Sequence, residues 1–248
     1  MSIHIQNALR LAWIDTLVRY KKSYLGPFWY TISNFFGIVA LSLVWAELIQ
    51  EDLPAFVPRL AIGLVLWQLI SGVLTESPRI LNDNSALIKN INIPIWFLPA
   101  RLMFRQVINF LHNMLLVSAI LIYFRVNPFQ QPLSLALGLL TLFGILALLS
   151  FMLAGIGARY RDVRFGIETI MPLLFFVSPV VFKFNSINST LINMNPLTYM
   201  IELVRLPVLG VIPDPHMYLR AFLLYLFLIP LAYFYYKKAK NKMAFWVN

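Results

Sequence analysis

The chain has 248 residues, of which 60% are hydrophobic and only 12% are charged. So few charged side chains cannot cover the surface of a water-soluble domain of this size, and the composition therefore predicts a membrane protein. The absence of cysteine excludes disulfide bonds, thiolate metal sites and a cysteine nucleophile.

The first predicted element is a helix over residues 3–22, before any long apolar run. Its apolar face carries Leu9, Trp13, Leu17 and Tyr20, and another face carries Asp15, Arg19 and Lys22. This pattern is typical of a helix lying along the membrane interface, and it fits a helix packed on its own protein equally well. The charges in this segment, without a small-residue cleavage site, predict that it is not a signal peptide.

Six apolar runs follow that are long enough to cross about 30 Å of hydrocarbon. They lie near residues 31–49, 56–75, 104–124, 133–157, 165–183 and 218–236. Arg59 and Gln68 interrupt the second run and Pro230 the sixth, which predicts tilted or kinked helices there. The fold class expected is an all-α membrane protein with one transmembrane domain over residues 1–248. Its parts are an interfacial helix and loop (1–30), spans one to five (31–183), an external gate loop (184–217), and span six with a tail (218–248).

The distribution of Lys and Arg predicts the orientation of these spans. With six spans both termini share one side, and 15 of the 20 Lys and Arg residues fall on that side. The positive-inside rule therefore places both termini in the cytoplasm. The formal net charge of +10 then reports topology, and a nucleic-acid partner is not expected.

Two connections are longer than turns. Residues 76–101 are polar, then amphipathic, then Pro-rich, which predicts a cytoplasmic surface helix offered to a partner. Residues 184–217 contain the apolar stretch "NMNPLTYMIELVRLPVLGV", whose length suits a short re-entrant or interfacial helix that plugs or gates the external side.

Motifs for ATP binding, metal binding and hydrolysis are missing from the sequence. There is no phosphate-binding Gly-Lys loop, and His4, His112 and His216 lie on separate elements without metal-ligand spacing. Asn109, His112 and Asn113 share one helical face, where hydrogen bonding between helices is favoured over a proton relay. Glu168 is interpreted as a charge at a helix N-terminus. No catalytic residue and no metal are assigned, and the chain is not expected to be an enzyme by itself.

Four stretches in order resemble one family: "RYKKSYLGPFWYTIS" (19–33), "ARYRDV" (158–163), "MPLLFFVSPVVF" (171–182) and "NPLTYMIELVR" (195–205). They resemble the membrane subunits (permeases) of type-2 ABC transporters that export O-antigen, capsule or teichoic acid across the bacterial cytoplasmic (inner) membrane. The resemblance covers nearly the whole chain. It implies a homodimer with the glycan path between the two copies, in a multi-pass membrane protein.

The same resemblance implies two copies of a separate ABC ATPase, which would bind ATP and Mg, whereas this chain would hold no cofactor. The ATPase would dock on about Glu76–Asn92 and Ile5–Lys22. The docking residues expected there are Asp15, Arg79, Asp83 and Lys89.

The substrate implied is a polysaccharide linked to a polyprenyl pyrophosphate. Its diphosphate would be met at the inner leaflet by a cationic, aromatic portal of Arg19, Tyr20, Lys21, Lys22, Tyr24, Gly26 and Pro27. Orientation charges and an aromatic belt would produce the same composition, since each cation contributes about 1 kcal/mol toward anionic lipid. Composition alone favours that second interpretation, and the resemblance favours the portal.

Aromatic rings suit a moving glycan because sugar faces stack on them weakly. The candidates for the glycan channel are Phe35, Phe36, Trp45, Phe175, Phe176 and Tyr199. Two alternatives remain: a type-2 exporter of a small amphiphile or drug, and a membrane-embedded glycan-modifying enzyme. The few intramembrane acids disfavour the enzyme.

Overall fold

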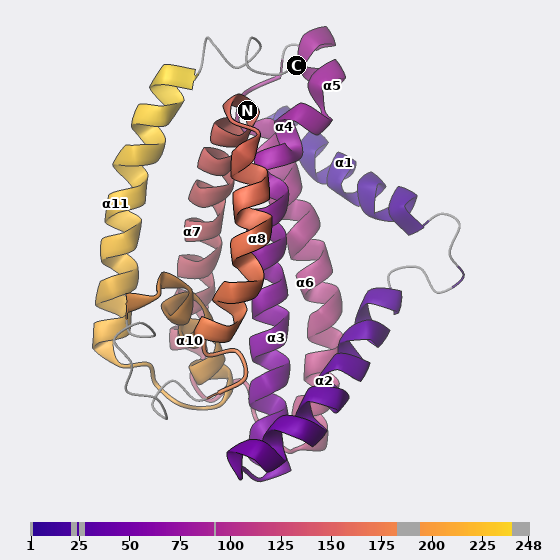
Figure 1. Cartoon of the computed structure of the whole chain (residues 1–248), viewed down its shortest axis with the longest axis vertical. Helices are drawn as coiled ribbons and strands as arrows, with labels where there is room; N and C mark the ends of the chain where they lie inside the picture. Colours follow the sequence, from indigo (N-terminus) through magenta and orange to yellow (C-terminus); the bar gives the residue numbers. More distant parts are fainter. Residues whose placement is uncertain (1, 21–23, 25–27, 92, 183–193, 240–248) are drawn as a thin grey trace.

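A computed structural model describes residues 2–20, 24, 28–91, 93–182 and 194–239 of the chain. Every regular element in these ranges is helical (Figure 1). The elements are α1 (Ser2–Tyr20), α2 (Phe28–Ile49), α3 (Leu53–Glu76), the 3-10 turn η1 (Ser77–Arg79), α4 (Ile80–Asp83), α5 (Ser85–Asn90), α6 (Phe97–Tyr123), α7 (Pro132–Arg159), α8 (Asp162–Val177), α10 (Pro196–Val208) and α11 (Pro215–Ala239). The predicted all-α class is confirmed.

Five helical segments within the described residues are long and apolar enough to cross a membrane, which makes the chain a multi-pass membrane protein. They are Thr31–Ile49, Leu53–Asp83, Phe97–Tyr123, Pro132–Arg159 and Pro215–Lys237. The start of α1 and the end of α11 lie at the same end of the bundle (Figure 1). We call this the terminal end and the other the distal end.

Helix α3 is the centre of the bundle. In an apolar stretch of 18 residues within its span 67% of the residues are buried, against 22% to 39% in the corresponding stretches of the other four. It contacts α2, α6, α7, α8 and α10. The buried Arg59 does not interrupt the helix, because its Nη1 donates to Oε1 of Glu51 over 3.1 Å. Glu51 follows a tight turn in which Gln50 adopts a positive φ of 54°.

The span expected over 165–183 is only partly a helix. Helix α8 has 16 residues and is about 24 Å long, shorter than the about 30 Å of a hydrocarbon core. It ends at Val177, and the next residue, Ser178, has an extended backbone with ψ 146°. The physical reason is Pro179, because a residue before proline is driven out of the helical region.

The distal connection contains the short helix that its apolar stretch predicts. Ten of the 13 residues of α10 are buried. Asn195 caps the helix, since its Oδ1 accepts from the Leu197 backbone N–H over 3.0 Å, while its Nδ2 donates to Ser178 Oγ over 3.0 Å. Gly138 of α7 allows the close approach, because a Cβ there would lie 1.9 Å from the Leu203 carbonyl oxygen.

Helix α1 lies obliquely at the terminal end (Figure 1) and packs on α6. Its buried stripe is made of small residues, Ala8, Ala12 and Thr16, which let the two backbones come close. Leu9, Trp13 and Leu17 stay exposed, as an interfacial helix requires. The two interpretations of this segment are therefore compatible: α1 packs on its own protein through one face and offers an apolar face to its surroundings.

Candidate functional site

Charged side chains from three helices meet near the terminal end. Arg101 of α6 donates from Nε to Oδ2 of Asp15 in α1 over 2.7 Å. Arg105, one helical turn further along α6, pairs with Glu76 at the end of α3 and lies 3.9 Å from Asp15. All four side chains are only 14% to 21% exposed, so these pairs are largely shielded from solvent. They fix α1 and α3 against α6.

Three amide side chains meet deeper in the bundle. Nδ2 of Asn34 in α2 donates to Oε1 of Gln68 in α3 over 2.8 Å and lies 2.9 Å from Oδ1 of Asn113 in α6. The interpretation of Asn113 as a hydrogen-bonding contact between helices is confirmed. His112, beside it, stacks edge-on against Phe28 with ring centroids 5.0 Å apart.

Polar side chains connect these two clusters along facing sides of α3 and α6. Ser71 and Thr75 bond back to carbonyl groups of their own helix. Asn109 is half-buried and makes no side-chain hydrogen bond within the described part of the chain. We call the whole set the polar strip, and it consists of Gln68, Ser71, Thr75, Glu76, Arg101, Arg105, Asn109, His112 and Asn113.

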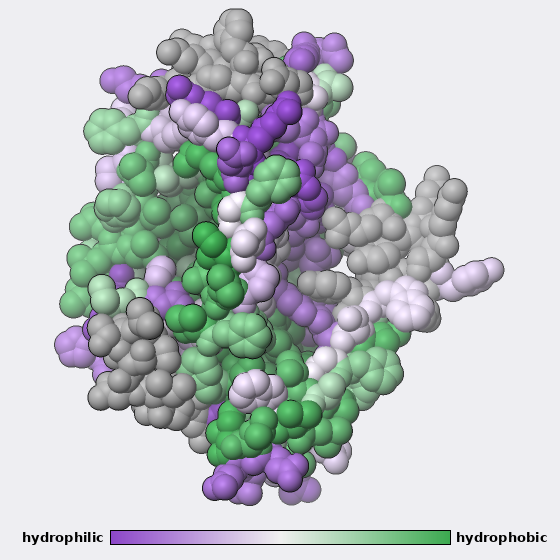
Figure 2. All heavy atoms as spheres, viewed as in Figure 1, coloured by the Kyte–Doolittle hydropathy of each residue, from purple (hydrophilic) through white to green (hydrophobic). Residues whose placement is uncertain are grey.

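The polar strip runs inward from the terminal end. From Glu76 to Gln68 it follows α3 for about 12 Å. Figure 2 shows hydrophilic surface continuing from the terminal end to about the middle of the bundle, in the hollow between α8 and α2. Its deeper part consists of amide, hydroxyl and imidazole groups without a fixed charge. Gln68, Ser71, Thr75 and Asn109 are half-buried there, whereas Asn113 is 1% exposed and Nε2 of His112 is buried. Such a surface suits water and hydroxyl-rich solutes. Its exposure to lipid would be unfavourable, because polar groups would then face hydrocarbon.

Exposed aromatic rings lie on the two helices that flank the hollow. Phe36 of α2 is 64% exposed and Phe176 of α8 is 69% exposed. Phe35, also exposed, lines an apolar pocket between α2, α3 and α6. Of the six aromatic residues predicted for a glycan channel, these three have side chains available at the surface of one copy.

The other three predicted channel residues pack inside the chain. Phe175 contacts Trp67 with centroids 5.5 Å apart, and Trp45 is half-buried against the core. Tyr199 is 6% exposed, and its hydroxyl accepts a hydrogen bond from Arg220 of α11, whose guanidinium lies 5.3 Å from the ring centroid. In this conformation these three rings contribute to the core, and sequence alone did not separate them from the exposed ones.

The predicted portal falls mostly outside the described residues. Lys21, Lys22, Gly26 and Pro27 lie outside them, as do the side chains of Arg19 and Tyr20. Tyr24 is described and is fully exposed. The segment joins α1, which ends at Tyr20, to α2, which begins at Phe28.

The predicted docking residues are spread over two kinds of environment. Asp15 is engaged with Arg101 inside the chain. Arg79 and Asp83 form an exposed pair at 3.8 Å, and Lys89 is exposed on α5. Between α1 and α5 lies a groove of about 410 Å³, whose lining includes Arg10, Ile14, Leu87, Ile91 and Phe97. The terminal end therefore offers a concave, partly apolar surface with cations beside it.

Several residues of the site were not predicted from the sequence. Gln68 and Arg105 were seen only as an interruption of a span and as an orientation charge. The sequence did contain a signal for them: Arg101, Arg105 and Asn109 recur at intervals of four, which places them on one helical face.

Among the described residues, no three His, Asp or Glu side chains gather closely enough to hold a metal ion.

Comparison with known proteins agrees with the predicted resemblance. The family model described as "ABC-2 type transporter" matches residues 7–209. The chain is 21% identical over 184 residues to an O-antigen export system permease protein RfbA from Myxococcus xanthus, covering 72% of this chain and 71% of the relative. It is 24% identical over 196 residues to a protein of the same name from Klebsiella pneumoniae, covering 75% of this chain and 74% of the relative. The chain belongs to the ABC-2 type transporter family of membrane proteins.

Proposed function

We propose that this chain is the transmembrane subunit of an ATP-driven exporter that moves a polysaccharide linked to a polyprenyl pyrophosphate across the bacterial cytoplasmic membrane. The observation that carries this proposal is the polar strip, which brings hydrogen-bonding groups to membrane depth in an otherwise apolar bundle. A glycan needs such a surface because its hydroxyl groups must exchange hydrogen bonds as it moves. The relatives named for O-antigen export support this choice of substrate class.

Two copies of the chain would complete the path. The strip lies in a hollow flanked by α2 and α8, whose outer faces carry exposed apolar rings (Figures 1 and 2). Left facing lipid, the strip would expose polar groups to hydrocarbon at a considerable cost. Pairing of the α2 and α8 faces of two copies would cover those rings and enclose the two strips. Phe36 and Phe176 would then lie at the edge of the enclosed path.

Energy and substrate entry would both come from the terminal end. ATP and Mg would be bound by two copies of a separate ATPase, seated against α1 and the segment from Arg79 to Lys89. The diphosphate would be received by Arg19, Lys21 and Lys22, with Tyr20 and Tyr24 at headgroup depth and Gly26-Pro27 turning the chain into α2. The polyprenyl tail would remain in lipid while the glycan follows the strip.

The proposal is tested by transport in vesicles that contain the full chain, its ATPase and a lipid-linked glycan. Asn109→Leu removes a hydrogen-bonding group from the strip without breaking any hydrogen bond within the described chain. We expect a severalfold loss of glycan transport with ATPase binding retained. The matched control is Ser118→Leu on the exposed face of the same helix, which should transport normally. Equal activity of both variants would contradict a glycan path along the strip.

A second assay separates a lipid-linked glycan from a small amphiphile as the substrate. Replacement of Arg19, Lys21 and Lys22 by Gln should lower transport of the diphosphate-linked glycan, because the charge-assisted hydrogen bonds are lost. Export of a small uncharged amphiphile should be unaffected. Unchanged glycan transport in this variant would favour the exporter of small amphiphiles.

A further inference from the structure

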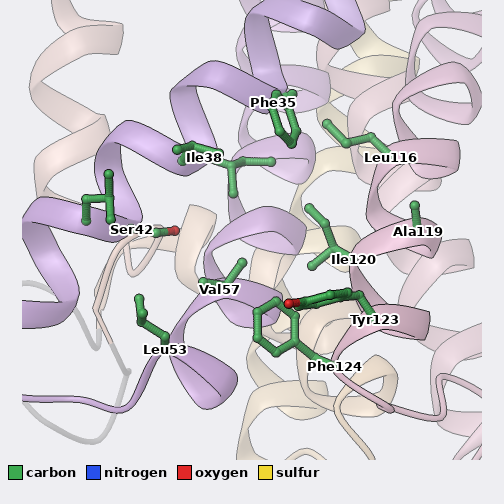
Figure 3. Close-up of a pocket in the computed structure, with 12 residues that line it drawn as sticks. Phe35, Ile38, Ser42, Leu53, Val57, Leu116, Ala119, Ile120, Tyr123 and Phe124 are labelled. Atoms are coloured by element: carbon green, nitrogen blue, oxygen red, sulfur yellow. The ribbon is translucent and has the colours of Figure 1, made fainter.

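A second cavity lies away from the polar strip, near the distal end. It has a volume of about 450 Å³ and is formed where α2 crosses the first turns of α3 and the last turns of α6 (Figure 3). Side chains from all three helices point into it, among them Phe35, Ser42, Val57, Ala119, Ile120 and Tyr123. Among the residues predicted for the glycan channel, Phe35 lines this pocket, and no residue of the polar strip lines it.

The chemistry of the lining suits hydrocarbon. No charged side chain lines the pocket, and the hydroxyls of Ser42 and Tyr123 are its only polar side-chain groups. Ser42 is 4% exposed, and its Oγ has no hydrogen-bond partner among the described residues. Tyr123 is 80% exposed, so Ser42 supplies the one buried hydroxyl of this lining, and a buried water needs two to four polar partners. An apolar chain can fill the space without losing hydrogen bonds.

The dimensions suit one lipid chain. The pocket follows α2 from Phe35 to Leu43, a rise of about 12 Å. One leaflet of a bilayer contributes about 15 Å of hydrocarbon. Leu43 and Tyr123 are 64% and 80% exposed, so the pocket opens on the outside of the bundle, where lipid would lie. A single acyl chain that enters from the distal leaflet would therefore occupy most of its length.

Two residues of opposite charge adjoin the pocket lining in the sequence. Asp52 directly precedes the lining residue Leu53, and Arg125 directly follows the lining residue Phe124. Both side chains are exposed, and neither has an ion-pair partner in the described part of the chain. Their signs match the dipoles of the N-terminus of α3 and the C-terminus of α6, so both are tolerated there without a ligand. Together they complement a headgroup that carries a phosphate and an ammonium group.

We propose that this pocket binds one acyl chain of a phosphatidylethanolamine-type phospholipid from the leaflet at the distal end. Arg125 pairs with the phosphate and Asp52 with the primary ammonium group. The complementarity disfavours a polyprenyl diphosphate, because that headgroup has no cation for Asp52 and a higher negative charge that Asp52 repels. The bound lipid fills the gap between α2 and α6 and supports the packing of α2 without taking part in transport.

The acyl-chain site is tested with the full chain and its ATPase in nanodiscs that contain phosphatidylethanolamine with a photoreactive acyl chain. Cross-links should map to residues 35–43 and 116–124. Ala119→Trp fills the pocket and should reduce these cross-links severalfold. The control Ala136→Trp, at an exposed alanine of α7 that is not part of the lining, should leave them unchanged. Equal cross-linking in the two variants would overturn the proposal.

The headgroup is tested by competition between phosphatidylethanolamine and phosphatidylglycerol, which has the phosphate but no amine. Asp52→Asn should reduce the preference for phosphatidylethanolamine by about two- to fivefold, the range expected for one exposed ion pair. Arg125→Gln should weaken cross-linking of both lipids. No change in either variant would overturn the assignment of the headgroup.

Two further outcomes would overturn the choice of occupant. One is displacement of the photoreactive phospholipid by a polyprenyl phosphate at equal concentration. The other is occupation by a second copy of the chain. Because the chain has no native cysteine, Ala119→Cys provides a single thiol on the α6 side of the lining, away from the α2 face that we propose pairs with the second copy. A disulfide between two copies through that thiol would show that protein, not lipid, covers the pocket.

Discussion

Arg205 and Glu202 form the most buried ion pair among the described residues. Both side chains are 1% exposed. Arg205 Nε donates to Glu202 over 3.2 Å, and its Nη1 donates to the Val180 carbonyl oxygen over 3.3 Å. The pair therefore ties α10 to the backbone that follows α8. Gly63 of α3 makes room for this contact, since a Cβ there would lie 2.8 Å from the Val180 oxygen.

Breaking this pair from one side should destabilise the protein strongly. We expect Glu202→Gln to lower the free energy of unfolding by about 3–5 kcal/mol, because it leaves a buried guanidinium without its counter-charge. Arg205→Met should be similarly damaging. The double variant Glu202→Leu with Arg205→Met should be less damaging than either alone, since both charges are then removed. Thermal unfolding of the purified protein in detergent measures all three.

The control for that cycle is an exposed pair of the same composition. Arg164 and Glu168 on α8 are 40% and 39% exposed, with 3.0 Å between Nε and Oε1. Glu168→Gln should change stability by no more than about 0.5 kcal/mol. If Glu202→Gln changed the free energy of unfolding as little as Glu168→Gln does, the result would contradict the dependence of α10 on its ion pair.

At the scale of elements, short helices are fixed by close backbone contacts and proline. Helix α8 stops before Pro179, and α10 fits against α7 only because residue 138 has no side chain. Helix α11, in contrast, continues through Pro230 from Pro215 to Ala239. Proline therefore coincides with a helix end at Pro179, and it is accommodated within helices at Pro58, Pro172, Pro207 and Pro230.

The contact between α7 and α10 can be tested with glycine substitutions. A Cβ at Gly138 would lie 1.9 Å from the Leu203 carbonyl oxygen, whereas a Cβ at Gly37 of α2 would meet nothing within 4 Å. Gly138→Ala should therefore force the helices apart and cost about 1–3 kcal/mol, as overpacking does. Gly37→Ala should be neutral or slightly stabilising. Unfolding curves of the two variants provide the measurement. Destabilisation by Gly138→Ala alone indicates local strain between α7 and α10, whereas equal destabilisation by both variants indicates that the protein tolerates no alanine at these glycines.

The groove between α1 and α5 gives a prediction about the ATPase. Ile91 is 52% exposed beside this groove. Ile91→Asp introduces an unpaired charge into an apolar docking surface and should markedly reduce co-purification of the ATPase. The matched substitution Ile212→Asp, at an exposed isoleucine of the distal end, should leave co-purification unchanged. Loss of the ATPase in the Ile212→Asp variant as well would point to general misfolding instead of a docking defect.

At the scale of the whole molecule, the bundle has a polar hollow on one side and apolar helices elsewhere. Helices α2 and α8 flank this hollow, and α11 lies apart from it (Figure 1). Single cysteines at Phe36 and Phe176 should cross-link two copies in native membranes, because both rings would face the partner copy. A cysteine at the equally exposed Phe227 of α11 should face lipid and not cross-link. Cross-linking only through α11 would contradict the proposed arrangement of the dimer.

The sequence by itself determined that this is an α-helical membrane protein of the ABC-2 type. Run length, hydropathy and proline position are local properties, so they predicted where α2, α3, α6, α7 and α11 run. They also located the short helix α10, and Pro179 carried the information that α8 would be short.

Only the tertiary structure decided which polar residues share a surface. Asn34, Gln68 and Asn113 come from three helices far apart in the sequence, and their contact depends on how those helices rotate against each other. For the same reason, periodicity could not separate the exposed Phe36 from the buried Tyr199. Residues 21–23 and 25–27 lie outside the described ranges, so the portal stays a prediction. Packing, which is non-local, decided which of the described side chains lie in the core and which lie at the surface.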